Sequence, residues 1–228
     1  MKKIILTIIA LLITIKGYSQ KDEAVAAAIG LVAGIGAGIA AVELLKEQLE
    51  LGAVEYALNN YPDIVDFQLK TASLEGTKLK DMSSVSIITF ELENLINKDR
   101  FIMFAFTSGG WINDFGVDFS FINWRRFDVK EWNELMKVYV ETASKNTISI
   151  NDIPESKIVN KGVKKDNDWL LEFDKLKGDV YYSKDYSDEF KVVFNEKSLG
   201  IYLKETSDLV QIKRNALIRA HEFLNKQD

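Results

Sequence analysis

The side chains best suited to ligand chemistry lie in one short segment, Ser108–Asp114 (SGGWIND). Its two glycines permit unusual backbone angles, Trp111 offers a flat apolar face, and Asn113 and Asp114 offer polar groups. Tryptophan beside amide and carboxylate groups on a loop suits the binding of a sugar or a peptide. Trp111, Asn113 and Asp114 are therefore the candidate ligand-binding residues. The competing interpretation is a hairpin whose Trp111 folds down onto the sheet.

The chain is poor in residues for nucleophilic, acid–base or metal chemistry. It has no cysteine and one histidine, so thiolate nucleophiles and zinc–thiolate sites are excluded and multi-histidine metal sites are hard to build. We expect that histidine, His221, on the surface of a C-terminal helix. Carboxylate pairs such as Asp114 with Asp118 arise freely among 34 acidic residues, so they do not indicate a glycosidase. We predict no catalytic residue, no metal site and no cofactor.

Two other segments carry polar groups that have simpler interpretations. Asp185, Asp188 and Glu189 offer oxygen ligands for a hard cation, but the segment lacks the glycine and the alternating ligands of a calcium loop. We expect a solvated turn between strands there. The segment Trp124–Phe127 (WRRF) combines two arginines with two aromatic residues, and we expect the arginine stems to cover aromatic core.

One motif points to a different class of function. Residues Gly36–Ala41 (GAGIAA) fit the G-x-G-x-x-A pattern of dinucleotide-binding folds, and Glu55 falls near the position of an acidic ribose partner. However, no further alternation of strands and helices follows. An exported enzyme remains the alternative function, either dependent on a nucleotide cofactor through Gly36 and Gly38 or acting as a carboxylate hydrolase.

The most unusual stretch is Ala24–Val42, nineteen residues of Ala, Gly, Val, Ile and Leu without a polar side chain. As a helix it would span about 28 Å, close to a hydrocarbon core of about 30 Å, although Ala and Gly contribute little to insertion. A small residue recurs at every fourth position, at Ala26, Gly30, Gly34 and Gly38. Such a glycine-zipper-like stripe lets another backbone approach closely. We predict that it packs against a membrane, a partner or its own domain.

The first nineteen residues indicate export. Met1–Ser19 combines Lys2 and Lys3 with the apolar run Ile4–Ile15 and small residues ahead of a cleavage site before Gln20. We therefore expect a periplasmic or cell-envelope protein, with membrane association as a further option. The net charge is −5 without a basic run, so nucleic acid is not an expected partner. The expected partner is another protein or a second copy, bound through Ala24–Val42.

Periodicity predicts the helices that must position these residues. An amphipathic helix is expected over Glu43–Asn59, ended by Pro62. A second starts at Asp128, where Glu131 completes a capping box, and extends to about residue 144. A third is expected over about residues 207–226, capped by Ser207.

Alternating apolar residues predict strands between these helices. The expected strands are 64–70, Val85–Leu92, Phe101–Thr107, Val117–Trp124, Trp169–Phe173, Asp179–Ser183, Phe190–Phe194 and Leu199–Leu203. Phe101–Thr107 is almost continuously apolar and suits a central strand. Runs of strands precede single helices, so the predicted class is α+β with mainly antiparallel strands.

The predicted organisation has three parts: a signal peptide over 1–19, a helical segment over 20–61 and an α+β domain over 62–228. A polar loop over about 145–168 would mark the junction between two halves of that domain, near 147–167. The leading functional hypothesis is an exported envelope protein with a structural, assembly or binding role. A carbohydrate- or peptide-binding module that uses Trp111 is a further alternative.

Overall fold

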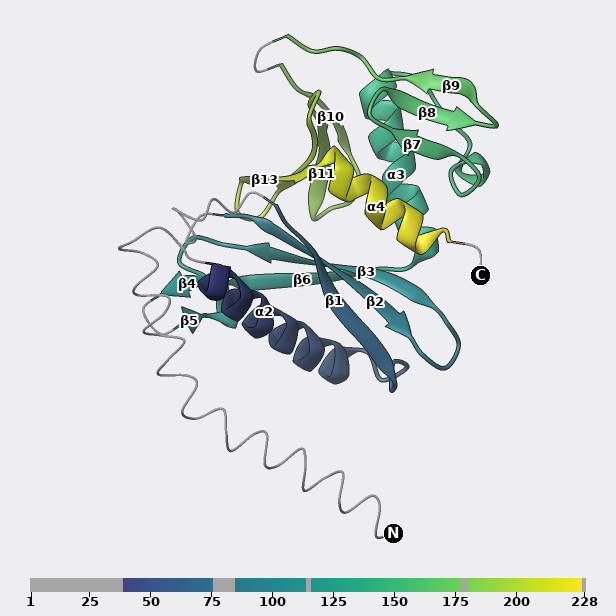
Figure 1. The fold of residues 1–228 in the computed structure, drawn as a ribbon. Coiled ribbons are helices and arrows are strands. Elements are labelled where there is room, and N and C mark those ends of the chain that lie inside the picture. The colour runs from purple at the N-terminus through teal and green to yellow at the C-terminus, as the bar shows by residue number, and fades with distance from the viewer. Residues whose placement is uncertain (1–38, 76–84, 114–115, 178–179, 227–228) are drawn as a thin grey trace.

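The computed structural model describes residues 39–75, 85–113, 116–177 and 180–226 (Figure 1). The predicted signal peptide, the stripe of Ala26, Gly30, Gly34 and Gly38, and Asp114 lie outside these residues. Of the apolar stretch, only its last four residues are described, as the first turn of a helix. Within the described ranges, no helix is both long enough and apolar enough to cross a membrane.

The chain is α+β, as predicted, with helices packed on antiparallel sheets. The elements in chain order are α2 (Ile39–Asn60), β1 (Phe67–Glu75), β2 (Ile87–Asn94), β3 (Arg100–Thr107), β4 (Ile112–Asn113), β5 (Gly116–Val117), η1 (Phe119–Phe121), β6 (Ile122–Phe127), α3 (Val129–Ser144), η2 (Ile150–Asp152), β7 (Lys157–Val159), β8 (Gly162–Lys165), β9 (Asp168–Glu172), β10 (Tyr182–Asp185), β11 (Phe190–Phe194), β12 (Ser198–Leu203), β13 (Asp208–Lys213) and α4 (Arg214–Leu224).

The first sheet has the strand order β1-β2-β3-β6, and both of its faces are covered. All eight residues of β3 are buried, which confirms the predicted central strand. Phe104 points to one face of the sheet, whereas Met103 and Ala105 point to the other, because side chains alternate along a strand. Apolar residues on both sides of β3 therefore give the sheet two cores.

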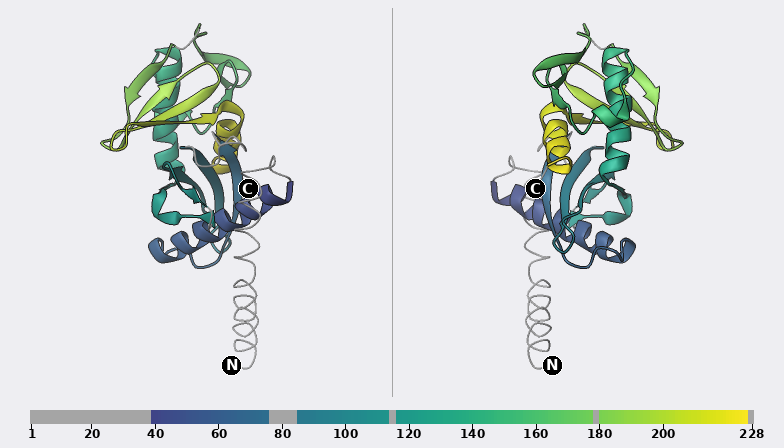
Figure 2. Two further views of the ribbon diagram at one scale, coloured as in Figure 1. Left: turned by 90° about the vertical axis from the view of Figure 1, so that its left-hand side faces the viewer. Right: turned by 90° about the vertical axis from the view of Figure 1, so that its right-hand side faces the viewer.

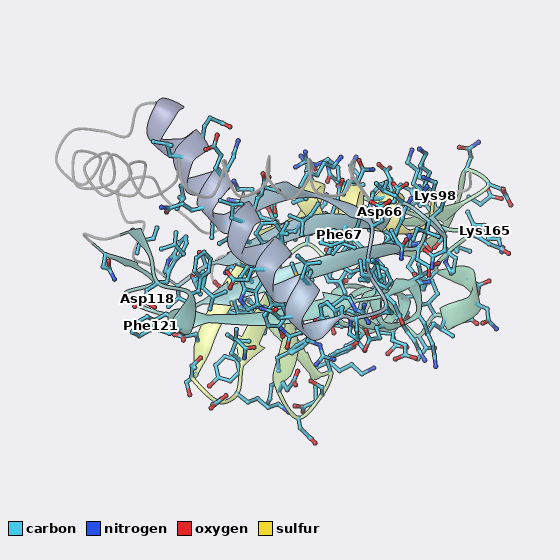
Figure 3. All side chains as sticks on the ribbon, turned by 90° about the horizontal axis from the view of Figure 1, so that it is seen from below. Asp66, Phe67, Lys98, Asp118, Phe121 and Lys165 are labelled. Atoms are coloured by element: carbon cyan, nitrogen blue, oxygen red, sulfur yellow. The ribbon has the colours of Figure 1, made fainter. Side chains whose placement is uncertain are left out.

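Helix α2 covers the Met103 face of this sheet. Leu45, Leu49 and Ala53 are fully buried and repeat every fourth residue along the helix. Seen from the side of α2, the helix crosses the strands obliquely, with Asp118 and Phe121 at one side of it and Phe67 at the other (Figure 3). The predicted amphipathic helix is confirmed, and it ends before Pro62, as expected.

The other face of the first sheet shares one core with the second half of the chain. This core joins Phe104 of β3, Trp132 and Tyr139 of α3, Phe194 of β11 and Leu217 of α4. The second sheet has the order β10-β11-β12-β13, and α4 lies between it and the first sheet (Figure 2). The segments on either side of residues 147–167 are therefore packed into a common core.

The start of α3 follows the predicted capping box. The Asp128 carboxylate accepts a hydrogen bond from the Glu131 backbone N–H at 2.8 Å, and the Glu131 carboxylate accepts one from the Asp128 N–H at 3.4 Å. These bonds satisfy two backbone donors that the first turn of a helix leaves free.

Several predicted elements differ from the structure. The strand expected over Asp179–Ser183 is observed as β10, which begins only at Tyr182. The helix expected from Ser207 is wrong at its start, because Asp208–Lys213 forms β13 and α4 begins at Arg214. The loop expected over about 145–168 is also wrong in part, since it contains β7 and β8. The strand expected over Val117–Trp124 is interrupted by η1.

Candidate functional site

A pocket of about 660 Å³ lies where four segments of the second half of the chain meet. The β7–β8 turn and β9 with the residues after it form one side, and the β11–β12 turn and the start of α4 form the other. Its volume falls within the range of about 300–1,000 Å³ that is usual for small-molecule sites. We refer to it as the Arg214 pocket.

The lining of this pocket is mainly basic, although the chain as a whole is acidic. Five basic and three acidic side chains line it, whereas the full sequence has 29 basic and 34 acidic residues. Of the basic residues, Lys161, Lys175 and Lys197 form no ion pair with any residue that the structure describes. Of the acidic residues, Asp174 is paired at 3.4 Å with Lys145, a residue that does not line the pocket. The pocket therefore concentrates positive charge.

Arg214 is one of the lining residues and is only 8% exposed. Its guanidinium donates hydrogen bonds to the backbone carbonyls of Asn160 and Asn195 and, at 3.3 Å, to the Tyr139 hydroxyl. It also stacks near the rings of Phe173 and Phe194, at 5.2 and 5.5 Å from their centroids. No carboxylate among the described residues lies within ion-pair distance of the guanidinium. Its charge is therefore stabilised by two carbonyls, one hydroxyl and two aromatic rings.

Helix α4 adds to the positive potential at Arg214. Strand β13 runs directly into the helix, so that Lys213 is the N-cap and Arg214 the first helical residue. Lys213 makes no side-chain capping bond to the helix, and the first turn contains no acidic residue. The N-terminal end of a helix carries partial positive charge and normally favours Asp, Glu, Ser or Thr. The Arg214 charge, which has no carboxylate partner among the described residues, is therefore electrostatically unfavourable at this end of the helix.

Hydrogen bonds tie both turns that frame the pocket to neighbouring segments. In the β7–β8 turn, the Asn160 and Lys161 carbonyls accept bonds from the Arg214 guanidinium and the Phe173 N–H. In the β11–β12 turn, the Asn195 side-chain oxygen accepts hydrogen bonds from the backbone N–H groups of Lys197 and Ser198 at 2.8 and 2.7 Å. The backbone N–H of Arg214 donates to the Lys197 carbonyl at 3.2 Å. The start of α4 and this turn therefore form one fixed wall of the pocket.

The predicted ligand-binding residues lie elsewhere, in the first half of the chain. Trp111 is fully buried in the core beneath α2, folded onto the sheet as in the competing interpretation. Asn113 is exposed in β4, and Asp114 lies outside the described residues. The structure therefore gives Trp111 no open face for a ligand.

The acidic segment before β11 is largely engaged in ion pairs. Asp185 lies 2.9 Å from Lys204, whose hydrogen bond lowers the pKa of the Asp185 carboxyl. Glu189 pairs with Arg125 at 2.5 Å. The described part of the chain contains no cluster of three acidic or histidine residues that is suited to a metal ion.

The arginines of the WRRF segment cover aromatic residues, as predicted. The Arg126 guanidinium lies 4.0 Å from the centroid of Tyr61 and 4.7 Å from that of Phe101.

The prediction for His221 is wrong, because its side chain is buried, with 3% exposure, on the side of α4 that meets Trp132 of α3. Its Nδ1 accepts a hydrogen bond from the Trp132 indole N–H at 3.1 Å. Burial lowers the pKa of His221 below its ordinary value of 6.5, while the nearby backbones of Ser156 and Ile153 act in the opposite direction. The imidazole therefore has a structural role as a neutral hydrogen-bond acceptor.

Comparison with known proteins gives no match to a family model, a curated protein or a solved structure. The described strand pairings are all antiparallel, whereas a dinucleotide-binding fold rests on parallel strands. The GAGIAA motif therefore has no supporting structural context in the described residues. The Arg214 pocket is the best-supported candidate site.

Proposed function

We propose that this protein is an exported, non-enzymatic binding protein of the cell envelope, and that the Arg214 pocket binds an anionic ligand. The observation that carries this proposal is the Arg214 guanidinium, which is buried in the lining of a basic pocket without a neutralising carboxylate among the described residues. The pattern of Met1–Ser19, which predicts an export signal, supports the proposed envelope location.

An anionic ligand would relieve an electrostatic cost that the folded chain bears. A buried charge without a counter-charge is destabilising, and the Arg214 guanidinium also lies in the first turn of α4, at the positive end of the helix. A ligand carboxylate or phosphate about 4 Å from the guanidinium would gain about 4 kcal/mol at an effective dielectric constant of about 20. Because hydrogen bonds already tie both framing turns to neighbouring segments, little ordering is needed on binding.

The proposed role of the apolar stretch Ala24–Val42 is to anchor this domain at the cell envelope. The repeat of Ala26, Gly30, Gly34 and Gly38 suits close packing against a membrane helix, a partner or a second copy. Cell fractionation with a carbonate wash, followed by N-terminal sequencing of the native protein, tests this part. A mature protein that starts at Gln20 and stays with the envelope fraction is expected. Recovery in the cytosolic fraction with an intact N-terminus would overturn the proposed location.

A thermal-shift titration tests anion binding by the purified mature protein. Citrate and inorganic phosphate serve as probes, with sodium chloride at equal ionic strength as the control, because salt screens exposed charges. A probe at about 100 times its Kd stabilises the fold by about 2.7 kcal/mol, which raises the Tm by roughly 5–11 °C for a chain of this size. If neither probe raised the Tm above its value in sodium chloride, the proposed function would be overturned.

A matched pair of double variants localises the effect. Lys161→Gln with Lys197→Gln removes two basic groups from the pocket lining. Lys130→Gln with Lys157→Gln removes two exposed basic groups elsewhere and changes the net charge equally. We expect the first pair to lose most of the anion-dependent shift and the second pair to keep it. Equal losses in the two would show a general charge effect instead of a site at Arg214.

A further inference from the structure

An exposed tryptophan forms part of the wall of the Arg214 pocket. Trp169 of β9 is 41% exposed and lies on the pocket lining with Glu172. The two residues are three positions apart, and in a regular strand they would point to opposite faces. Strand β9 contains a bulge, because Val163 pairs with Leu171 and Lys164 with Trp169, which leaves Leu170 unpaired. The bulge shifts the alternation and brings Trp169 to the same pocket as Glu172.

The indole ring is held in place from the side of the neighbouring strand. The Lys164 ammonium lies 4.2 Å from the centroid of the Trp169 ring, and the two residues are cross-strand partners. A cation over an aromatic face is attracted to the ring, so this contact stabilises the observed orientation of the indole. The pocket therefore has a pre-oriented flat apolar surface in addition to its charges.

The charges of the pocket are distributed instead of converging on one point. The basic residues come from the β7–β8 turn, the segment after β9, the β11–β12 turn and the start of α4. Glu172 and Glu196 also line the pocket, and neither forms an ion pair with a residue that the structure describes. Carboxylates accept hydrogen bonds from hydroxyl groups and repel phosphate chains. The lining thus fits a ligand that has both hydroxyl and anionic groups.

We infer that the ligand is an acidic oligosaccharide, a short chain of sugar rings that carry carboxylate groups. One ring stacks on Trp169, a carboxylate of the ligand meets Arg214, and ligand hydroxyls meet Glu172 and Glu196. This inference rests on the proposed function, since it specifies the anion that the pocket takes. The pocket volume of about 660 Å³ suits several linked rings and exceeds what a single inorganic anion fills.

Calorimetric titration of the mature protein tests this inference. The probes are trimers of galacturonic acid, mannuronic acid and glucuronic acid, with the neutral trimer maltotriose and ATP for comparison. At least one uronate trimer is expected to bind at least tenfold more tightly than maltotriose, ATP and inorganic phosphate. Tighter binding of ATP, or binding of no uronate, would overturn the inference. If citrate still stabilises the protein in that case, the proposed anion-binding function stands without it.

Substitution of the tryptophan provides the second measurement. Trp169→Ala is expected to weaken uronate binding at least tenfold, whereas Leu170→Ala, at a residue of the same 41% exposure, is expected to leave it within twofold. The conservative Trp169→Phe keeps an aromatic ring and is expected to retain part of the affinity while it removes a ligand-dependent change in tryptophan fluorescence. Unchanged affinity in Trp169→Ala would overturn the stacking role. Circular dichroism of each variant confirms that the fold is intact.

Discussion

Acidification between pH 6.5 and 5 is expected to destabilise the fold through His221. The imidazole is buried, and its Nδ1 accepts a hydrogen bond from the Trp132 indole at 3.1 Å. A proton on Nδ1 would place two donors against each other and put a charge into the core. Burial accordingly lowers the pKa of His221 in the folded state below 6.5. The unfolded chain therefore takes up a proton in this pH range before the folded chain does.

The size of the effect follows from the difference in bound protons. One proton more on the unfolded state lowers the free energy of unfolding by at most about 1.4 kcal/mol per pH unit. The loss starts as the pH falls through 6.5 and ends at the lower pKa of the folded state. At higher pH both states are neutral at this residue, so stability no longer depends on it. Because His221 is the only histidine of the chain, no second histidine contributes to this slope, and the variant below separates it from the carboxyl groups that titrate near pH 5.

Urea denaturation at pH steps from 7.5 to 5, followed by tryptophan fluorescence, measures this slope. The control is His221→Asn, which has no titrating group and whose side-chain oxygen can accept the Trp132 hydrogen bond. It is expected to be less stable at pH 7.5, because it leaves a small cavity, but to show a flat profile down to pH 5. A wild-type profile that is flat over this range, or an equal slope in the variant, would refute the reasoning.

Two further substitutions test features of the backbone. Gly162 has φ 154°, and a Cβ there would lie 2.1 Å from the Leu171 carbonyl oxygen, so Gly162→Ala is expected to lower the free energy of unfolding by about 1–3 kcal/mol. Gly109→Ala, where no atom lies within 4 Å of the added Cβ, is the control, and a similar loss there would contradict the argument. Asp128→Ala removes the capping box of α3 and is expected to cost about 1 kcal/mol in urea denaturation, whereas Lys130→Ala in the same turn is expected to change stability little.

The elements that sequence reasoning placed well are those with long, undisturbed patterns. Three such patterns agree with the structure: the apolar run of β3, the capping box at Asp128, and Leu45 and Leu49 four residues apart on the buried side of α2. The sequence predicts the start of the last helix seven residues ahead of Arg214, at Ser207. The reason is that Ser207 resembles an N-cap, and that Leu209 and Ile212 are spaced as on one face of a helix. In the structure Val210 and Ile212 alternate with exposed residues and pair with β12.

That error also concealed the candidate site. With the helix starting at Ser207, Lys213 and Arg214 fall in its interior, where basic residues are unremarkable. With the start at Arg214, the same two residues lie at the positive end of the helix dipole, where they are unusual. The other pocket residues come from separate turns, so no local motif in the sequence joins them. A tryptophan within a polar segment, as at Trp169, is a sequence feature that suggests a ligand contact. The bulge at Leu170 that places Trp169 on the pocket lining cannot be predicted from the alternation of apolar residues.

The position of α4 has a consequence for the order in which the chain can fold. The helix supplies Leu217 and Leu224 to the core that also contains β3 and α3, and Arg214 ties its first turn to carbonyls in the β7–β8 and β11–β12 turns. The first sheet thus cannot finish burying its second face until α4 has been synthesised. Every intermediate that precedes the docking of α4 exposes apolar surface. This order is compatible with the export proposed above, because an exported chain that crosses a membrane in an extended state folds only after all its elements are present.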